Sequence, residues 1–154
     1  MDNWTVVASE LDPDRAIAAG SNLLVGNGFL GYRGTSPEQG AEDYVALVVA
    51  GTYDCADGHW RELATAPNPL YVAAGLNGTP IGIAGSDAAE LALDLRSGEF
   101  TLQAEQTVDG VRFVISVERF ASYDKLGVLA QRWSIAVDRS AEIDVSFGVD
   151  GEIW

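Results

Sequence analysis

The sequence is short of the residues on which several common functions depend. Its 154 residues include one cysteine, Cys55, one histidine, His59, and one lysine, Lys125. A single cysteine excludes an internal disulfide and is typical of a reducing compartment, so we expect a cytoplasmic location. With so few sulfur and imidazole ligands, the chain lacks the spacing of a zinc or transition-metal site, and we expect no metal and no cofactor.

Basic charge and long hydrophobic runs are also scarce. The chain has 23 acidic against 9 basic residues, a formal net charge of −14 at pH 7. Such a field repels phosphate backbones and anionic lipid, which argues against nucleic acid and membrane partners. No apolar run approaches a membrane span, and the first residues lack the basic and apolar pattern of a signal peptide. We therefore expect a soluble protein.

The second half of the chain alternates apolar and polar residues with a period of two. The alternation predicts strands over residues 91–95, 100–105, 111–117, 129–137 and 143–149. Asp109-Gly110 predicts a type I′ hairpin between two of them. Half-buried strands joined by short turns are typical of antiparallel sheets. The sequence therefore predicts an all-β, antiparallel β-sandwich, with one domain over residues 1–154.

The first half predicts shorter elements. We expect a strand over residues 4–8, a brief helix over 13–19 that Gly20 ends, and a strand over 44–50 that is buried on both faces. Residues 53–69 show neither period and are predicted as a long irregular loop. Loops of this length are often functional, which makes the segment a candidate site.

Nine residues near the start concentrate four glycines with two aromatic rings and an arginine. The stretch Gly26-Asn27-Gly28-Phe29-Leu30-Gly31-Tyr32-Arg33-Gly34 resembles the GNGyLGxRG signature of glycoside hydrolase family 65, whose members include maltose, trehalose and kojibiose phosphorylases. Further matches follow in the family's order: Ala50-Gly51-Thr52-Tyr53, Glu62-Leu63 before Pro67-Asn68, Leu93-Asp94-Leu95-Arg96-Ser97-Gly98, Arg119-Phe120-Ala121-Ser122 and Val149-Asp150-Gly151.

The resemblance implies the family's amino-terminal domain, a super-sandwich of the galactose-mutarotase type. In the family this sandwich is longer than 154 residues and is followed by a helical linker and an (α/α)₆ barrel, so we expect a truncated, incomplete sandwich. The family's general acid is a glutamate on the barrel, and the site for inorganic phosphate, a co-substrate, lies there too. We therefore assign no catalytic residue to this chain, and we expect the barrel as its partner, with a homodimer left open.

Three residues are candidates for contact with a sugar. Tyr53 and Trp60 could stack on the apolar face of a sugar ring, or pack against a partner domain. Arg33 could face the sugar site of the barrel, but the favoured interpretation is structural, with its guanidinium clamping a carboxylate such as Glu38 or Glu42. Arg119 has the same ambiguity, and strand pairing is the favoured interpretation.

The leading hypothesis is an accessory domain of an inverting α-glucoside phosphorylase or hydrolase, supporting a catalytic barrel. One alternative is a free-standing carbohydrate-binding module that uses Trp60 and Tyr53. Another is a mutarotase-type epimerase centred on His59, with Asp57 and Glu62 near it in sequence. That alternative is the weaker one, because mutarotases commonly rely on more than one histidine.

Overall fold

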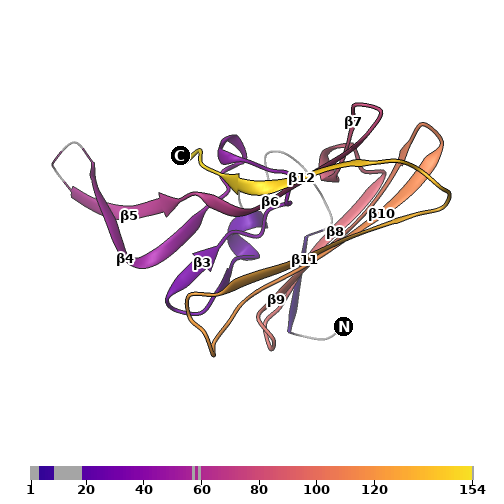
Figure 1. The fold of residues 1–154 in the computed structure, drawn as a ribbon. Coiled ribbons are helices and arrows are strands. Elements are labelled where there is room, and N and C mark those ends of the chain that lie inside the picture. Colours follow the sequence, from indigo (N-terminus) through magenta and orange to yellow (C-terminus); the bar gives the residue numbers. More distant parts are fainter. Residues whose placement is uncertain (1–3, 9–18, 57, 59, 154) are drawn as a thin grey trace.

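The computed structural model describes residues 4–8, 19–56, 58 and 60–153, and within them the chain is built almost entirely of β-strands (Figure 1). The strands are β1 (Thr5–Ala8), β2 (Val25–Gly26), β3 (Leu30–Tyr32), β4 (Leu47–Ala56), β5 (Trp60–Ala66), β6 (Asn68–Leu76), β7 (Thr79–Ile81), β8 (Ala88–Asp94), β9 (Glu99–Val108), β10 (Val111–Ala121), β11 (Leu129–Val137) and β12 (Asp144–Asp150). Two 3-10 turns, η1 (Ala41–Asp43) and η2 (Ile83–Gly85), interrupt them.

The strands form three antiparallel sheets. The first has the order β1-β8-β9-β10-β11, the second β12-β6-β7 and the third β2-β3-β4-β5. Within each sheet, every pair of neighbouring strands is antiparallel. The predicted all-β, antiparallel fold class is therefore confirmed.

The hairpin of β9 and β10 follows directly from its sequence pattern. Phe100 and Leu102 on β9, with Phe113, Ile115 and Val117 on β10, are buried, while the residues that alternate with them are half-buried or exposed. The turn between the strands, residues 109–110, has φ values of 50° and 74°, as a type I′ turn requires. The predicted strands and their turn are confirmed here.

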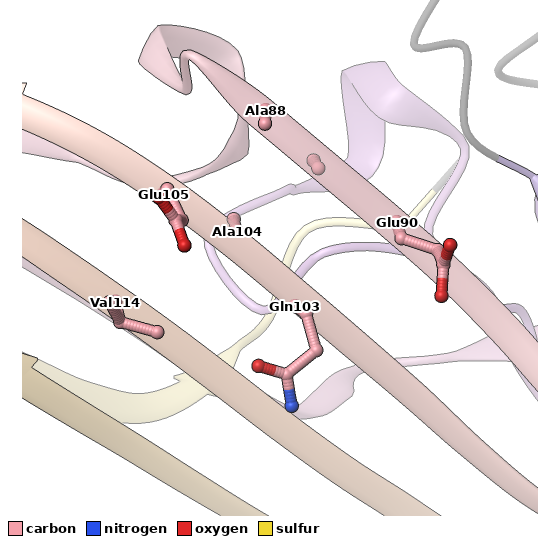
Figure 2. A pocket seen from close by; sticks show the side chains of 7 residues that line it. Ala88, Glu90, Gln103, Ala104, Glu105 and Val114 are labelled. Carbon is pink, nitrogen blue, oxygen red and sulfur yellow. The ribbon is translucent and has the colours of Figure 1, made fainter.

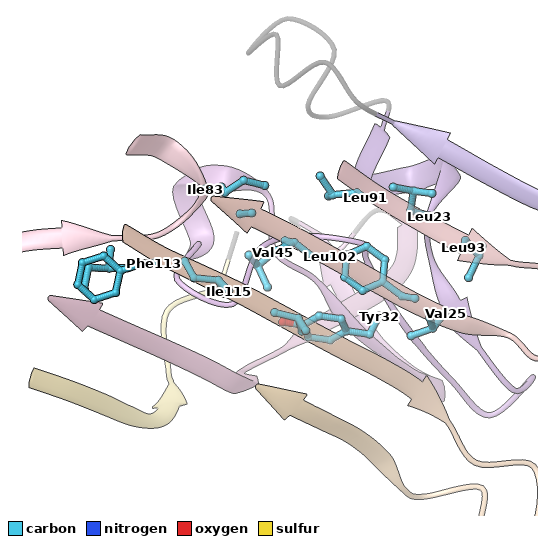
Figure 3. Packing of buried hydrophobic residues seen from close by; sticks show 14 of the residues in the cluster. Leu23, Val25, Tyr32, Val45, Ile83, Leu91, Leu93, Leu102, Phe113 and Ile115 are labelled. Carbon is cyan, nitrogen blue, oxygen red and sulfur yellow. The ribbon is translucent and has the colours of Figure 1, made fainter. Parts of the chain in front are cut away.

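The core lies between the five-stranded sheet and the other two sheets (Figure 3). Leu102 and Ile115 belong to the five-stranded sheet, whereas Val25 and Tyr32 come from β2 and β3 and Leu76 from β6. Burial of these side chains, each typically worth about 1.5–3 kcal/mol, is the main stabilising term of the two layers.

The prediction of an irregular loop over residues 53–69 is wrong. β4 continues through this segment to Ala56, and β5 returns along it, with Tyr53 opposite Leu63 and Ala56 opposite Trp60. A register shift after Val48 and a positive φ of 85° at Gly51 bend β4 without ending it. Backbone pairing between β4 and β5 makes these residues strands, although their side chains do not alternate between apolar and polar.

Three smaller expectations also need correction. The segment over 44–50 is not buried on both faces, because β4 begins only at Leu47 and Ala50 is exposed. Gly20 does not end a helix, since residues 19–22 are helical, and the expected helix over 13–18 lies outside the described residues. β12 was expected to be half-buried, yet six of its seven residues are exposed.

Candidate functional site

The signature turn connects β2 to β3 and is closed by a side chain. Gly26 pairs with Gly31, and the backbone amides of Phe29 and Leu30 both donate to Asn27 Oδ1 at 3.0 Å. Gly28 has a φ of +84°, which favours glycine. The Asn-Gly pair of the signature therefore builds the turn itself.

The same asparagine connects the turn to a distant loop. Its Nδ2 donates to the carbonyl oxygens of Ser122, at 2.6 Å, and Leu126, at 3.0 Å, in the connection between β10 and β11. Asn27 is buried, and all of these bonds use the amide in one orientation. The turn of the four-stranded sheet is thus fixed to the end of the five-stranded sheet.

The last glycine of the signature is required by close packing. A Cβ atom at Gly34 would lie 2.5 Å from the Leu23 Cβ and 2.6 Å from the Leu23 carbonyl oxygen. The Gly34 amide also donates to the Gly20 carbonyl oxygen at 2.9 Å. No larger residue fits here without moving the backbone.

Arg33 is buried beside this contact. Its Nη1 donates to the Tyr44 carbonyl oxygen at 2.8 Å, and its guanidinium lies against Gly20, where a Cβ atom would be 2.9 Å from Nη2. Burial lowers the pKa of Arg33. The Glu38 carboxylate, expected as a partner of Arg33, instead accepts from the Ser36 hydroxyl and, at 2.5 Å, from the Ile83 amide.

Arg119 lies at the centre of a buried polar network. Its side chain is 0% exposed, and its guanidinium lies over the rings of Tyr32 and Phe100, at 4.5 and 4.9 Å from their centroids. Burial lowers the pKa of Arg119 to about 10, with the charge interaction with Tyr32 acting in the opposite direction. The group therefore stays charged at neutral pH, stabilised by the faces of two aromatic rings.

The hydrogen bonds of Arg119 reach the segment that follows β3, and its partner Gln131 extends the network to β6. Nε and Nη2 donate to Gln131 Oε1 at 3.0 and 2.6 Å, and Nη1 donates to the carbonyl oxygens of Arg33, at 3.3 Å, and Thr35, at 3.1 Å. Gln131 Nε2 in turn donates to the Leu70 carbonyl oxygen of β6 at 3.0 Å. One charged side chain thus connects β10 and β11 to the signature segment and to β6.

Tyr32 adds a second bond between the sheets. Its hydroxyl donates to Asn68 Oδ1 at 2.8 Å, and the Leu70 amide donates to the same oxygen at 3.0 Å. Burial raises the pKa of Tyr32, although the charge of Arg119 and a hydrogen bond with Thr35 lower it in part. The hydroxyl therefore remains a proton donor.

Sequence reasoning missed the burial of Arg119, although a signal for it exists. On β10, Val111, Phe113, Ile115 and Val117 face the core, and Arg119 continues the same alternation. An arginine on the inward side of an otherwise apolar strand indicates a buried charge that needs several acceptors. Strand pairing is real, with Arg119 opposite Phe100 and Gln131, but it is not the main role of the side chain.

Tyr53 and Trp60 lie on the hairpin of β4 and β5, which extends away from the sandwich (Figure 1). They are 59% and 60% exposed. Tyr53 is opposite Leu63, and Trp60 is three residues before Leu63, so alternation along β5 places the two rings on opposite faces of the hairpin. The structure therefore does not bring them together as one stacking platform.

The outer face of the five-stranded sheet has a shallow depression (Figure 2). Its lining comes from β8, β9 and β10, and of the described residues there none is aromatic. Gln103 accepts from the Ser116 hydroxyl at 2.9 Å, and Glu105 pairs with Arg112 at 2.5 Å. With Gln103 and Glu105 engaged by neighbouring side chains and no ring to stack on, this depression is not a convincing sugar site.

Two other possibilities for the described residues are a metal site and a membrane span. No cluster of three or more metal-ligating side chains occurs there. No helix in the same residues has the length and apolar character needed to cross a membrane. Asp57 and His59, named in the epimerase hypothesis, lie outside the described residues.

Comparison with known proteins identifies relatives of this domain. The sequence is 36% identical over 154 residues to the 1,2-alpha-glucosylglycerol phosphorylase of Bacillus selenitireducens, covering 98% of this chain and 20% of that protein. It is 34% identical to the nigerose phosphorylase of Lachnoclostridium phytofermentans, covering 99% of this chain and 20% of that protein. The chain thus spans about a fifth of the length of these curated relatives.

A solved structure and a family match agree with the relationship to these relatives. A solved structure that carries the name kojibiose phosphorylase, from human microbiome, superimposes with a TM-score of 0.81 over 92% of this chain and 21% of its own, at 15% identity. The pattern that defines "Glycosyl hydrolase family 65, N-terminal domain" matches residues 6–154. The chain therefore belongs to glycosyl hydrolase family 65, as its N-terminal domain.

Proposed function

We propose that this chain is the accessory domain of a longer disaccharide phosphorylase and supports a helical (α/α)₆ barrel that carries the chemistry. The observation that supports this most strongly is the family match over residues 6–154, in a chain that spans 20% of each of the two relatives named above. The activities in their names, on glucosylglycerol and on nigerose, belong to proteins about five times longer than this match.

The interior of the domain suits such a supporting role. Arg119, Tyr32 and Asn27 each bond across two elements far apart in sequence, so the sheets are held in one arrangement. Inverting cleavage requires a general acid and an attacking phosphate or water at one place, which the proposal puts on the barrel. A domain that only supports the barrel therefore needs no catalytic group of its own. Inorganic phosphate is a co-substrate of the proposed whole enzyme rather than a ligand of this domain.

Contact of Tyr53, Trp60 or Arg33 with a sugar stays a prediction, as does the cytoplasmic location. Tyr53 and Trp60 lie on an exposed hairpin from which either ring could contact a substrate or a neighbouring domain. Arg33 is buried and bonded to the Tyr44 carbonyl oxygen, which favours its structural interpretation.

Phosphorolysis by the isolated chain tests the proposal. We expect no release of glucose 1-phosphate from nigerose or kojibiose in the presence of inorganic phosphate, because the domain lacks the acid and phosphate site of the barrel. The proposal would be contradicted if the purified chain released glucose 1-phosphate and a heat-unfolded sample of the same chain did not. A sugar affinity lost in Trp60→Ala and retained in Tyr53→Ala would instead support a binding module, since the two rings lie on opposite faces.

A further inference from the structure

The chain contains two Asn-Gly sequences, at residues 27–28 and 77–78. In such a pair the glycine has no side chain to obstruct its own backbone nitrogen, which can attack the side-chain amide carbon of the asparagine. Whether this reaction occurs in a folded protein depends on how firmly the amide and the turn around it are held. The two sequences of this chain differ in both respects.

The side-chain amide of Asn27 is held at both of its polar atoms. Its oxygen accepts from the backbone amides of Phe29 and Leu30, each at 3.0 Å. Its nitrogen donates to the carbonyl oxygens of Ser122 and Leu126. The residue is 7% exposed. The amide carbon of Asn27 therefore cannot turn toward the next backbone nitrogen unless these four bonds break together.

The second Asn-Gly sequence lies in a much more open place. Asn77 and Gly78 form the two-residue turn between β6 and β7, with φ values of 50° and 80°. Both residues are exposed, and a Cβ atom at Gly78 would meet nothing within 4 Å. β7 is an edge strand of three residues that includes Pro80, which has no amide proton to donate. Local opening of such a hairpin requires far less free energy than global unfolding.

The Asn77 side chain makes a contact that deamidation would destroy. Its Nδ2 donates to Asp109 Oδ2 at 3.1 Å, in an exposed hydrogen bond. Asp109 lies in the turn between β9 and β10, so the bond connects a turn of the three-stranded sheet to a turn of the five-stranded sheet (Figure 1). An exposed hydrogen bond contributes little stability and restrains the amide weakly.

We infer that Asn77 is a site of spontaneous deamidation, and that the product separates the two turns. The Gly78 backbone nitrogen forms a bond to the Asn77 Cγ, and the bond from Cγ to Nδ2 breaks. The Gly78 amide proton leaves with Nδ2 as ammonia, and a five-membered imide remains. Water then opens the imide at either carbonyl, which gives aspartate or isoaspartate.

The product replaces a hydrogen-bond donor by a negative charge. In either product a carboxylate stands where the Asn77 amide bonded Asp109, so the hydrogen bond is lost and two like charges face each other. The turn between β6 and β7 should then move away from the turn between β9 and β10. The inference concerns this chain alone and does not depend on the proposed function.

Peptide mapping by mass spectrometry tests the site. In warm, mildly alkaline buffer, we expect the folded chain to gain aspartate and isoaspartate at Asn77 at least about ten-fold faster than at Asn27, because only local opening is needed. In concentrated urea the two asparagines should react at similar rates, since each then precedes a glycine in an open chain. Equal rates in the folded chain, or a reaction at Asn77 that occurs only in urea, would overturn the inference.

Asn77→Asp reproduces one product and tests its effect on the turns. We expect hydrogen exchange of the Thr79 amide to become about ten-fold faster, with a smaller change in about 1 M salt. Asn77→Asp with Asp109→Asn exchanges the amide and the carboxylate and should restore slow exchange. Asn22→Asp makes the same change in charge at an exposed position elsewhere and should leave Thr79 unaffected. Unchanged exchange in Asn77→Asp, or no recovery in the double variant, would contradict the separation of the turns.

Discussion

At the scale of single residues, Arg119 is the side chain on which the polar interior depends. A buried charge without a carboxylate partner is costly, and here neutral acceptors and two aromatic rings compensate it. Removal of the arginine alone leaves those acceptors behind. The change in stability on replacing Arg119 alone therefore differs from the change on replacing Arg119 together with its polar partners by apolar residues.

We expect Arg119→Met to lower the free energy of unfolding by about 3 kcal/mol or more, because Gln131 Oε1 and the carbonyl oxygens of Arg33 and Thr35 lose their donor. Urea unfolding measures the change. The control is Arg112→Met on the same strand, whose exposed ion pair with Glu105 contributes little. Similar losses in both variants would contradict the role given to Arg119.

The same charge gives a pH dependence with a definite sign. The pKa of Arg119 is lowered from its ordinary value to about 10, so the folded state binds fewer protons than the unfolded state only between these two pKa values. The contribution of Arg119 to stability therefore rises with pH there and is constant at lower pH. We expect the stability difference between the wild type and Arg119→Met to be equal at pH 6 and pH 8, measured by urea unfolding.

Asn27 gives the second test at this scale. Asn27→Asp keeps the acceptor for Phe29 and Leu30 but turns a second oxygen toward the carbonyls of Ser122 and Leu126. We expect a loss of about 2 kcal/mol, since two partly buried carbonyl oxygens then face an acceptor. Faster hydrogen exchange of the Val128 amide should accompany it. Asn22→Asp, at an exposed position before β2, is the control and should change stability little.

At the scale of elements, the segment before β2 and the end of the signature are held by close contact. Gly34→Ala would place a methyl group 2.5 Å from the Leu23 side chain, so we expect a loss of about 2 kcal/mol or more. Gly148→Ala on β12 meets nothing within 4 Å and should be neutral or slightly stabilising. Thermal unfolding of both variants measures the contrast. A stable Gly34→Ala protein would show that Leu23 packs differently.

The strands of the second half could be predicted because alternation and the Asp109-Gly110 turn are local signals. The hairpin of β4 and β5 could not, since its character comes from pairing across a bulge rather than from alternation. Among the candidate residues, a structural interpretation of Arg33 was predictable from its place among glycines. Its partner was not, because the Glu38 carboxylate is engaged by Ser36 and Ile83, residues whose approach depends on the tertiary fold.

At the scale of the whole molecule, the chain is an N-terminal domain of family 65 that combines a bonded interior with an exposed edge strand. The interior is tightly bonded around Arg119 and Asn27, whereas β12 exposes apolar residues at the edge of its sheet. Under the proposed function the domain contributes structure to a longer enzyme, and the choice of disaccharide should then reside in the barrel. The substrate preference of an enzyme that contains this domain therefore distinguishes a supporting role of the domain from a direct role in substrate selection.

The most direct measurement is the substrate preference of a chimera. Residues 1–154 would replace the matched fifth of the Lachnoclostridium phytofermentans nigerose phosphorylase, with a chimera carrying Arg119→Met as the control for folding of the domain. We predict that the chimera phosphorolyses nigerose and keeps its ratio of kcat/KM for nigerose over kojibiose within about three-fold of the parent. A folded chimera whose preference moves to another disaccharide would contradict the account, because this domain would then help to select the substrate.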